Sequence, residues 1–248
     1  MGLEKRILLS ILFPMLFSSV CYSKKQPEPA GNNGVVVVEL FTSEGCSSCP
    51  AAETVLAGIS NEYKNKVYVL EFHVDYWDNL GWKDVFSSGV YTERQQKYAT
   101  LFHLSSTYTP QAIVNGRNEL VGSDRTKLHS LINGYLQKEA TNKIRLSAMA
   151  TGKNVAVKYS LSDAKGQVLN IALVEKNAET NVRRGENSGR KLAHINIVRE
   201  LKTITAKEQG ALDIILPDGL SANDCIIIAY AQDKDTFELR GAAEVPIN

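Results

Sequence analysis

Two cysteines, Cys46 and Cys49, lie between a run of β-branched residues and a segment with helical periodicity. The run Val35–Phe41 shows little alternation of apolar and polar residues, which is typical of a strand buried on both faces. Apolar residues recur at helical spacing across Cys46–Asn61, and Val67–Phe72 predicts a second buried strand. Together these pieces predict a right-handed βαβ unit with the cysteine pair at the start of its helix.

A Cys-X-X-Cys pair at the start of a helix is suited to thiol–disulfide exchange. Backbone N–H groups at a helix N-terminus stabilise a thiolate, so we expect Cys46 to be exposed, partly ionised at neutral pH and the attacking nucleophile. Cys49 lies one turn further along the same helix face, where it can resolve a mixed disulfide. The sequence therefore predicts Cys46 and Cys49 as catalytic residues.

Other interpretations of the cysteine pair are a metal site and an inert structural disulfide. Structural zinc needs about four ligands, and the nearest further cysteine of the mature chain is Cys225, in an apolar strand where we expect a buried, inert thiol. We therefore expect no metal and no cofactor. Copper handling by the pair with His73 as a distal ligand remains an alternative, although a packed or hydrogen-bonded role for His73 is the simpler expectation.

A long, mostly helical insertion, Asp75–Leu104, follows the second strand. After it, Thr109 and Pro110 directly precede a short strand, Gln111–Val114, then a hairpin and a last helix. We expect a cis Thr109–Pro110 peptide, which would bring the neighbouring backbone beside the cysteine pair, where it could hydrogen-bond an extended chain. Thr109 and Pro110 are therefore the predicted substrate-binding residues.

Aromatic and acidic residues are concentrated at the start of this insertion. They form either a polar and aromatic rim beside the cysteine pair or ordinary packing of the inserted segment. The residues concerned are Asp75, Tyr76, Trp77, Trp82 and Asp84.

From about Asn142 the pattern changes to short strands that alternate with turns, which is typical of a β-sandwich. We expect an α/β domain over 35–140 and an all-β domain over 141–248. His194 is the one histidine of the second half, and no acid is predicted to pair with it. The expected strands are Ile144–Ala148, Val155–Leu161, Val168–Glu175, Ala193–Leu201, Ala211–Leu216, Cys225–Ala231 and Leu239–Val245.

The N-terminal segment has the pattern of an export signal. Lys5 and Arg6 precede an apolar run of eleven residues, Ile7–Phe17, which is shorter than the roughly 20 residues needed to cross a bilayer as a helix. We therefore expect a signal peptide over 1–23, a linker over 24–34 and an extracytoplasmic protein, either periplasmic or secreted.

Cys21 closes the apolar run after small residues, as in lipoprotein signals. Lipid attachment at Cys21 and simple cleavage after Ser23 are both open, and membrane contact is expected only through such a lipid. In either case the mature protein works outside the cytoplasm, where disulfides persist.

The charge balance argues against a nucleic-acid partner. The 248 residues include 28 Lys+Arg and 27 Asp+Glu, for a formal net charge of +1, whereas nucleic-acid binders usually carry a basic excess. We instead expect partners that are protein thiols or disulfides of the cell envelope, together with a redox partner protein.

Four segments carry a more specific resemblance: VELFTSEGCSSCP, FHVDYWDNLGWKD, YTPQAIVNG and RRGENSGRKLAHINIVR. The order of elements up to about residue 137 resembles the thioredoxin fold, and the four segments together resemble the DUF1223 family, a group of exported thioredoxin-like proteins of undefined function with a β-rich C-terminal half. The resemblance implies an α/β thioredoxin-like domain followed by an all-β sandwich-like domain.

The resemblance also suggests two sets of supporting residues. Thioredoxins keep a buried acid before the cysteine pair, and the candidates for such a proton relay here are Glu39 and Glu44. A Gly-rich basic loop in the second half is expected to contact the first domain or a partner, unless it is only a solvated hairpin. Its contact residues would be Arg183, Arg184, Glu186, Asn187 and Arg190.

The leading functional hypothesis is a thiol–disulfide oxidoreductase of the cell envelope. The alternatives are a non-catalytic thioredoxin-like binding module with a structural disulfide and a copper-handling protein. The reduction potential of the cysteine pair separates exchange from a structural bridge, because structural disulfides typically lie below about −300 mV.

Overall fold

A computed structural model of the chain describes residues 34–248. The predicted signal peptide and the lipid site at Cys21 lie outside the described residues, as does nearly all of the predicted linker. The described helices and strands are β1 Val36–Thr42, α1 Cys49–Glu62, β2 Val67–His73, α2 Gly89–Leu101, β3 Gln111–Val114, β4 Asn118–Val121, α3 Arg125–Leu136, β5 Ile144–Thr151, β6 Asn154–Leu161, β7 Gln167–Asn181, β8 Lys191–Thr205, β9 Gln209–Ile215, a 3-10 turn Ala222–Asp224, β10 Cys225–Asp233 and β11 Leu239–Pro246.

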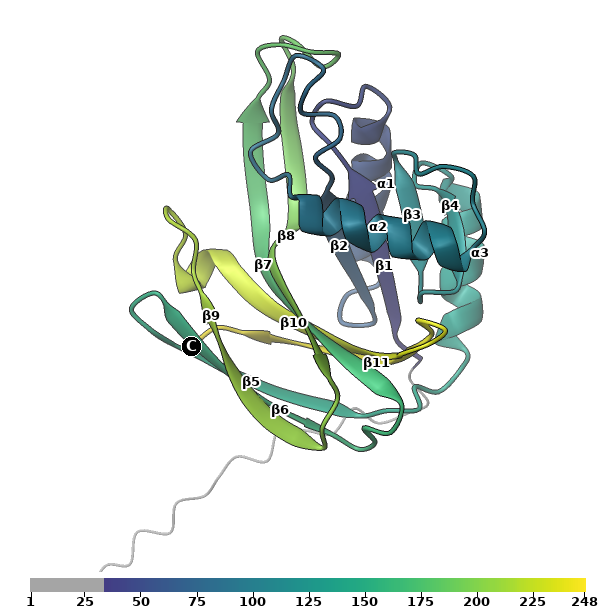
Figure 1. The fold of residues 1–248 in the computed structure, drawn as a ribbon, viewed down its shortest axis with the longest axis vertical. Helices are drawn as coiled ribbons and strands as arrows, with labels where there is room; N and C mark the ends of the chain where they lie inside the picture. Colours follow the sequence, from purple (N-terminus) through teal and green to yellow (C-terminus); the bar gives the residue numbers. More distant parts are fainter. Residues whose placement is uncertain (1–33) are drawn as a thin grey trace, which may run out of the picture. The chain divides into compact units, whose positions relative to one another are not determined.

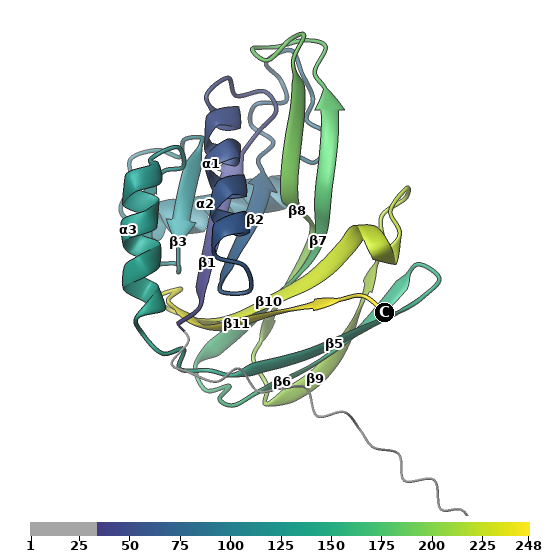
Figure 2. The ribbon, with the colours of Figure 1, turned by 180° about the vertical axis from the view of Figure 1, so that it is seen from behind.

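Eight of the strands form one mixed sheet, in the order β11-β10-β7-β8-β2-β1-β3-β4. β1 is parallel to β2, whereas β3 is antiparallel to β1 and β4 to β3. Helix α2 crosses one face of this sheet (Figure 1), and α1 and α3 lie on the opposite face (Figure 2). The protein is therefore a mixed α/β structure in which β1 is a central strand.

The burial of β1 explains why its sequence is so apolar. All seven of its residues are buried. Val38 and Leu40 pack with α1 and α3, while Val37 and Phe41 pack with the side chains of α2 on the other face. A strand covered by helices on both faces has no solvent side, so the usual alternation of apolar and polar residues is lost.

A second, three-stranded sheet, β5-β6-β9, lies against the C-terminal part of the large sheet. Its apolar residues, including Val155 and Val157, pack in one core with Leu169 and Ile171 of β7 and with Ile227 of β10. The strands predicted for the second half are present, and β7 and β8 are longer than expected, at 15 residues each.

The second half does not fold as a separate sandwich, which departs from the expectation. β7, β8, β10 and β11 continue the sheet begun by the first half, and β8 runs parallel to β2 with Glu71 opposite Ile197. The described residues form one compact unit. The physical reason is that β2 would otherwise be an open sheet edge with unpaired N–H and C=O groups. Pairing with β8 covers that edge.

A buried ion pair connects the two halves on the α2 face. The Arg94 guanidinium donates two hydrogen bonds to the Glu39 carboxylate, at 2.5 and 2.9 Å, and a third to Gln232 of β10 at 3.0 Å. The Tyr98 hydroxyl also donates to Glu39, at 2.5 Å. Because Glu39 and Arg94 are buried, these contacts compensate charges that would otherwise be costly to remove from water.

Candidate functional site

Cys46 and Cys49 form a disulfide between the end of β1 and the start of α1, with Cα atoms 5.4 Å apart. The helix begins at Cys49, not at Cys46 as the sequence suggested. Cys46 lies in the preceding turn, which the Cys49 N–H closes by donating to the Cys46 carbonyl at 3.2 Å. Pro50 therefore occupies the first turn of α1, as expected from its lack of an N–H.

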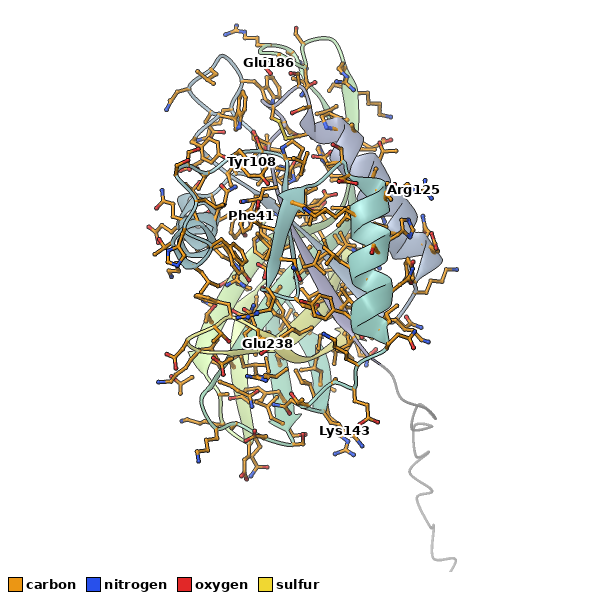
Figure 3. All side chains as sticks on the ribbon, turned by 90° about the vertical axis from the view of Figure 1, so that its right-hand side faces the viewer. Phe41, Tyr108, Arg125, Lys143, Glu186 and Glu238 are labelled. Atoms are coloured by element: carbon orange, nitrogen blue, oxygen red, sulfur yellow. A yellow bond between two sulfur atoms is a disulfide. The ribbon has the colours of Figure 1, made fainter. Side chains whose placement is uncertain are left out.

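The expected exposure of Cys46 is wrong, because only 1% of this residue is accessible to solvent and Cys49 is fully buried. The hairpin between β7 and β8 covers the cysteine turn. The Asn187 side-chain amide donates to the Glu44 and Cys46 carbonyls, both at 2.9 Å, and the Ser47 N–H donates to Glu186 at 3.0 Å. In Figure 3 Glu186 lies beyond the start of α1, at the end of this hairpin.

The structure divides the predicted loop residues into two groups. Glu186 and Asn187 contact the cysteine turn, and Arg190 donates to the Asn187 side-chain oxygen at 2.7 Å, which orients the amide. Arg183 and Arg184 are exposed. The contact with the first half is thus made by an amide and a carboxylate, rather than by arginines pairing with carboxylates.

Thr109 and Pro110 lie next to the cysteine turn, joined to it by Trp77. The Thr109–Pro110 peptide bond is cis, which confirms that prediction. The Trp77 indole N–H donates to the Thr109 hydroxyl at 2.9 Å, and a Cβ placed on Gly45 would lie 3.0 Å from the Trp77 Cβ. Of the aromatic residues after β2, Trp77 therefore lies beside the cysteine turn and links it to Thr109.

The two proposed proton-relay acids lie in different places. Glu39 shares the α2 face of β1 with Val37 and Phe41 and is bound by Arg94, so the structure does not bring it to the disulfide. Glu44 is buried directly before the cysteine turn, where its carboxylate accepts from the Trp82 indole at 2.6 Å.

Glu44 belongs to a larger buried cluster that the sequence did not predict. Glu71 and His73 come from β2, His194 from β8, Glu53 from α1 and Asp84 from the loop before α2. His194 approaches Glu53 at 3.2 Å and Glu44 at 3.4 Å, so the expectation that no acid pairs with it is wrong. The alternating acid and histidine in the apolar strand β2 are the one local signal that pointed to this cluster.

The charges of the cluster shift one another's protonation. Burial by itself lowers the pKa of His73, but the neighbouring Asp84 carboxylate, 2.7 Å from Nδ1, outweighs this and raises the pKa to about 10. Burial likewise opposes the charge on His194, yet contacts with Glu44 and Glu53 raise its pKa to about 9. Burial raises the pKa of Glu71 to about 7, with His73 opposing the shift.

The model of a protein family described as "Protein of unknown function (DUF1223)" matches residues 37–232. The chain belongs to the DUF1223 family. A crystal structure of an Agrobacterium tumefaciens protein resembles this DUF1223 chain with a TM-score of 0.66 and 26% identity, covering 87% of this chain and 96% of that one. HBP35 of Porphyromonas gingivalis shares the fold, with a TM-score of 0.59 and 18% identity over 88% of this chain and 76% of that one. The comparison with curated proteins found no match.

Within residues 34–248, no helix of this DUF1223 protein is long and apolar enough to cross a membrane. The free cysteine of this part, Cys225, is buried as expected, and burial raises the pKa of its thiol to about 11. Among the described cysteines of this DUF1223 protein, Cys46 and Cys49 are therefore the candidates for a chemical role, because they lie close to the polar side chains of Ser48 and Glu44.

Replacing Asn187 by Ala should open the cysteine turn of this DUF1223 protein. The change leaves the Glu44 carbonyl without a donor and the Cys46 carbonyl with the Cys49 N–H alone, and two such losses of about 1 kcal/mol each raise the population of the open turn about thirtyfold. The rate of disulfide reduction by dithiothreitol should increase by a similar factor. Ser188→Ala, which removes an exposed hydroxyl of the same hairpin, is the matched control. Equal rates for the two variants would show that the hairpin does not limit access.

Proposed function

We propose that this DUF1223 protein is an exported thiol–disulfide oxidoreductase that works through Cys46 and Cys49. The observation that carries the proposal is the placement of the pair, after the central strand β1, at the start of α1 and beside Thr109 and Pro110. A pair held at a helix start favours a thiolate, as exchange requires.

The arrangement of the first half supports a thioredoxin-like fold. The strand order β2-β1-β3-β4, with α1 and α3 on one face and α2 on the other, agrees with the element order that suggested this fold. The packing of β5-β6-β9 on the C-terminal strands supports a sandwich-like description of the second half, although its larger layer is shared with the first half.

The proposed reaction starts from the reduced pair. The Cys46 thiolate attacks one sulfur of a client disulfide, releases the other client sulfur as a thiolate and forms a mixed disulfide. The Cys49 thiolate then attacks Cys46, so the client leaves as a dithiol and the pair becomes the disulfide. Two electrons pass from the pair to the client, and the reverse sequence oxidises a client dithiol.

Neighbouring groups are assigned supporting roles in this proposal. The Ser48 hydroxyl lies 3.4 Å from the Cys46 sulfur and can donate to its thiolate. Thr109 and Pro110 would hold the client backbone, and Glu44 is the proposed proton relay because Glu39 faces α2. The clients are protein thiols or disulfides of the cell envelope, served by a redox partner protein, in keeping with the predicted signal peptide and lipid site.

One observation favours a second function, a binding module whose disulfide is structural. The disulfide is almost fully buried beneath the β7–β8 hairpin, so a protein client has no direct access to the sulfurs in this conformation. For exchange to occur, the hairpin contacts through Glu186 and Asn187 must open.

The reduction potential of Cys46–Cys49 distinguishes the two functions. We expect a value above about −300 mV, measured by equilibration with dithiothreitol buffers and alkylation of the free thiols, because an exchanging pair must be reducible by cellular dithiols. A value well below this limit, together with no reduction of a disulfide-bonded test protein, would establish the structural bridge instead.

A further inference from the structure

A group of buried side chains with free ligand atoms lies where β2 meets β8. Glu71 and His73 are two residues apart on β2 and therefore lie on the same face of the sheet, where His194 of β8 joins them. One ligand atom from each of the three residues lies within 4.8 Å of the others. The His73 Nε2 and Glu71 Oε2 atoms are 3.9 Å apart, and the His194 Nδ1 and Glu71 Oε2 atoms are 4.0 Å apart.

Most polar atoms of this group are buried without a hydrogen-bond partner, although Oε2 of Glu71 accepts from the Ile195 N–H at 3.2 Å. Among the described residues, Nε2 of His73, both ring nitrogens of His194, Oε1 of Glu71 and Oε1 of Glu44 have no hydrogen-bond partner. The nearby carboxylate oxygens stand at 3.2 to 4.0 Å from the His194 nitrogens without hydrogen-bond geometry. Buried polar groups are nearly always hydrogen-bonded, so this many polar atoms without a partner at one place point to a ligand that the protein binds there.

Asp84 orients His73 as a carboxylate partner orients a metal ligand, and Glu44 lies near the outer ring nitrogen of His194. Asp84 contacts Nδ1 of His73 at 2.7 Å, which makes that nitrogen the donor and directs Nε2 at the cluster, where a bound metal ion would replace the Nε2 proton. Glu44 lies 3.4 Å from Nε2 of His194, on the side opposite to the nitrogen that approaches Glu71. A histidine that ligates a metal typically gives its other ring nitrogen to such a carboxylate.

We propose that Glu71, His73 and His194 bind one divalent transition-metal ion of the zinc class, with Glu53 as a fourth ligand. Two imidazoles and carboxylate oxygens suit zinc and its first-row neighbours, whereas a monovalent copper ion prefers sulfur, which the disulfide does not offer as thiolate. Tetrahedral zinc with bonds of about 2.0–2.1 Å needs ligand atoms about 3.4 Å apart, so the Glu71 carboxylate oxygen must approach each histidine nitrogen by about 0.5 Å. The dication also balances the excess of carboxylates.

The site connects the two halves of the chain. Two ligands come from β2, in the first half, and one comes from β8, in the second, beside the Glu71–Ile197 pair that joins these strands. The metal would therefore stabilise the folded chain independently of the thiol chemistry. Because the cysteine sulfurs are not ligands, metal binding can be tested independently of the proposed oxidoreductase function.

The experiment loads the site during folding, because the ligands are fully buried in the folded chain. The purified full chain is unfolded in a denaturant that contains a chelator, which removes any bound metal. It is then transferred to buffer without chelator, refolded with Co²⁺ or Zn²⁺ and desalted. Bound metal is measured by mass spectrometry, and visible d–d absorption reports tetrahedral Co²⁺. We expect one equivalent per chain, both in the parent protein and in the Cys46→Ser/Cys49→Ser variant.

Variants of the ligands identify the site. Glu71→Gln and His194→Ala should lower metal retention at least tenfold, whereas His103→Asn, an exposed histidine outside the cluster, should leave it unchanged. Metal should also raise the Tm of the parent, a readout that remains if a ligand variant fails to fold. Retention below about a tenth of an equivalent after refolding with no shift in Tm, or retention that depends on the cysteines, would overturn the proposal.

Discussion

Cys49→Ser should accumulate mixed disulfides through Cys46 when the reduced protein meets oxidised clients, whereas Cys46→Ser should form none. The reason is the geometry of the pair: Cys46 lies in the turn that the β7–β8 hairpin covers and uncovers, next to the Ser48 hydroxyl, while Cys49 is the first residue of the helix. Without Cys49 the mixed disulfide has no resolving thiolate, so it persists. Non-reducing electrophoresis with intact mass measures the adducts, and turnover of a disulfide-bonded client should fall to background in both variants.

The matched control is Cys225→Ser. Cys225 is buried in β10, and burial raises the pKa of its thiol to about 11, so its removal should leave the adducts and turnover unchanged. Adducts that form through Cys49 in Cys46→Ser would reverse the assignment of nucleophile and resolving residue. A Cys46 thiol that titrates at or above about 8.5 in the reduced protein would remove the basis for choosing it.

Arg94→Ala should cost about 3–5 kcal/mol of stability, among the largest losses that one substitution in this fold can cause. The change leaves the Glu39 carboxylate buried without its cationic partner and also removes a donor to Gln232. An isolated charge at the centre of the sheet has no access to water, so the folded state loses the compensation while the unfolded state does not. Urea unfolding measures the loss.

Two further variants test the cause. Arg125→Ala on α3 removes an exposed arginine and should change stability by no more than about 0.5 kcal/mol. Glu39→Gln combined with Arg94→Met removes both charges and should restore part of the stability lost in Arg94→Ala. If Arg94→Ala costs less than about 1 kcal/mol, water or another cation must reach Glu39, and the buried pair is not what fixes α2 on the sheet.

The elements that the sequence predicted well are those with a local signal. The β-branched runs Val35–Phe41 and Val67–Phe72 correspond to β1 and β2, because burial on both faces leaves a recognisable pattern within a few residues. The start of α1 was misplaced by three residues, since a Cys-X-X-Cys turn and a first helical turn have the same spacing.

The features that escaped prediction depend on contacts between distant segments. The sequence indicated strands at β2 and β8 separately, but nothing in either segment specifies that they lie side by side. The buried cluster was missed for the same reason. Glu53 reads as an ordinary helix residue and His194 as an isolated polar residue in a strand, and only the pairing of β2 with β8 brings them within 3.2 Å. The burial of Cys46 likewise depends on Asn187, in a hairpin of the second half.

The position of β8 beside β2 also affects how the chain reaches its folded state during synthesis. β2 is complete at residue 73, but its neighbour on one side begins only at residue 191. At the usual rate of about 5–20 residues per second, that edge waits roughly 6 to 25 s for its partner. Throughout this interval an apolar strand with unpaired N–H and C=O groups is open to other chains. A nascent chain of this fold therefore has a built-in need for protection, by a chaperone or by low local concentration, until most of the molecule has been made.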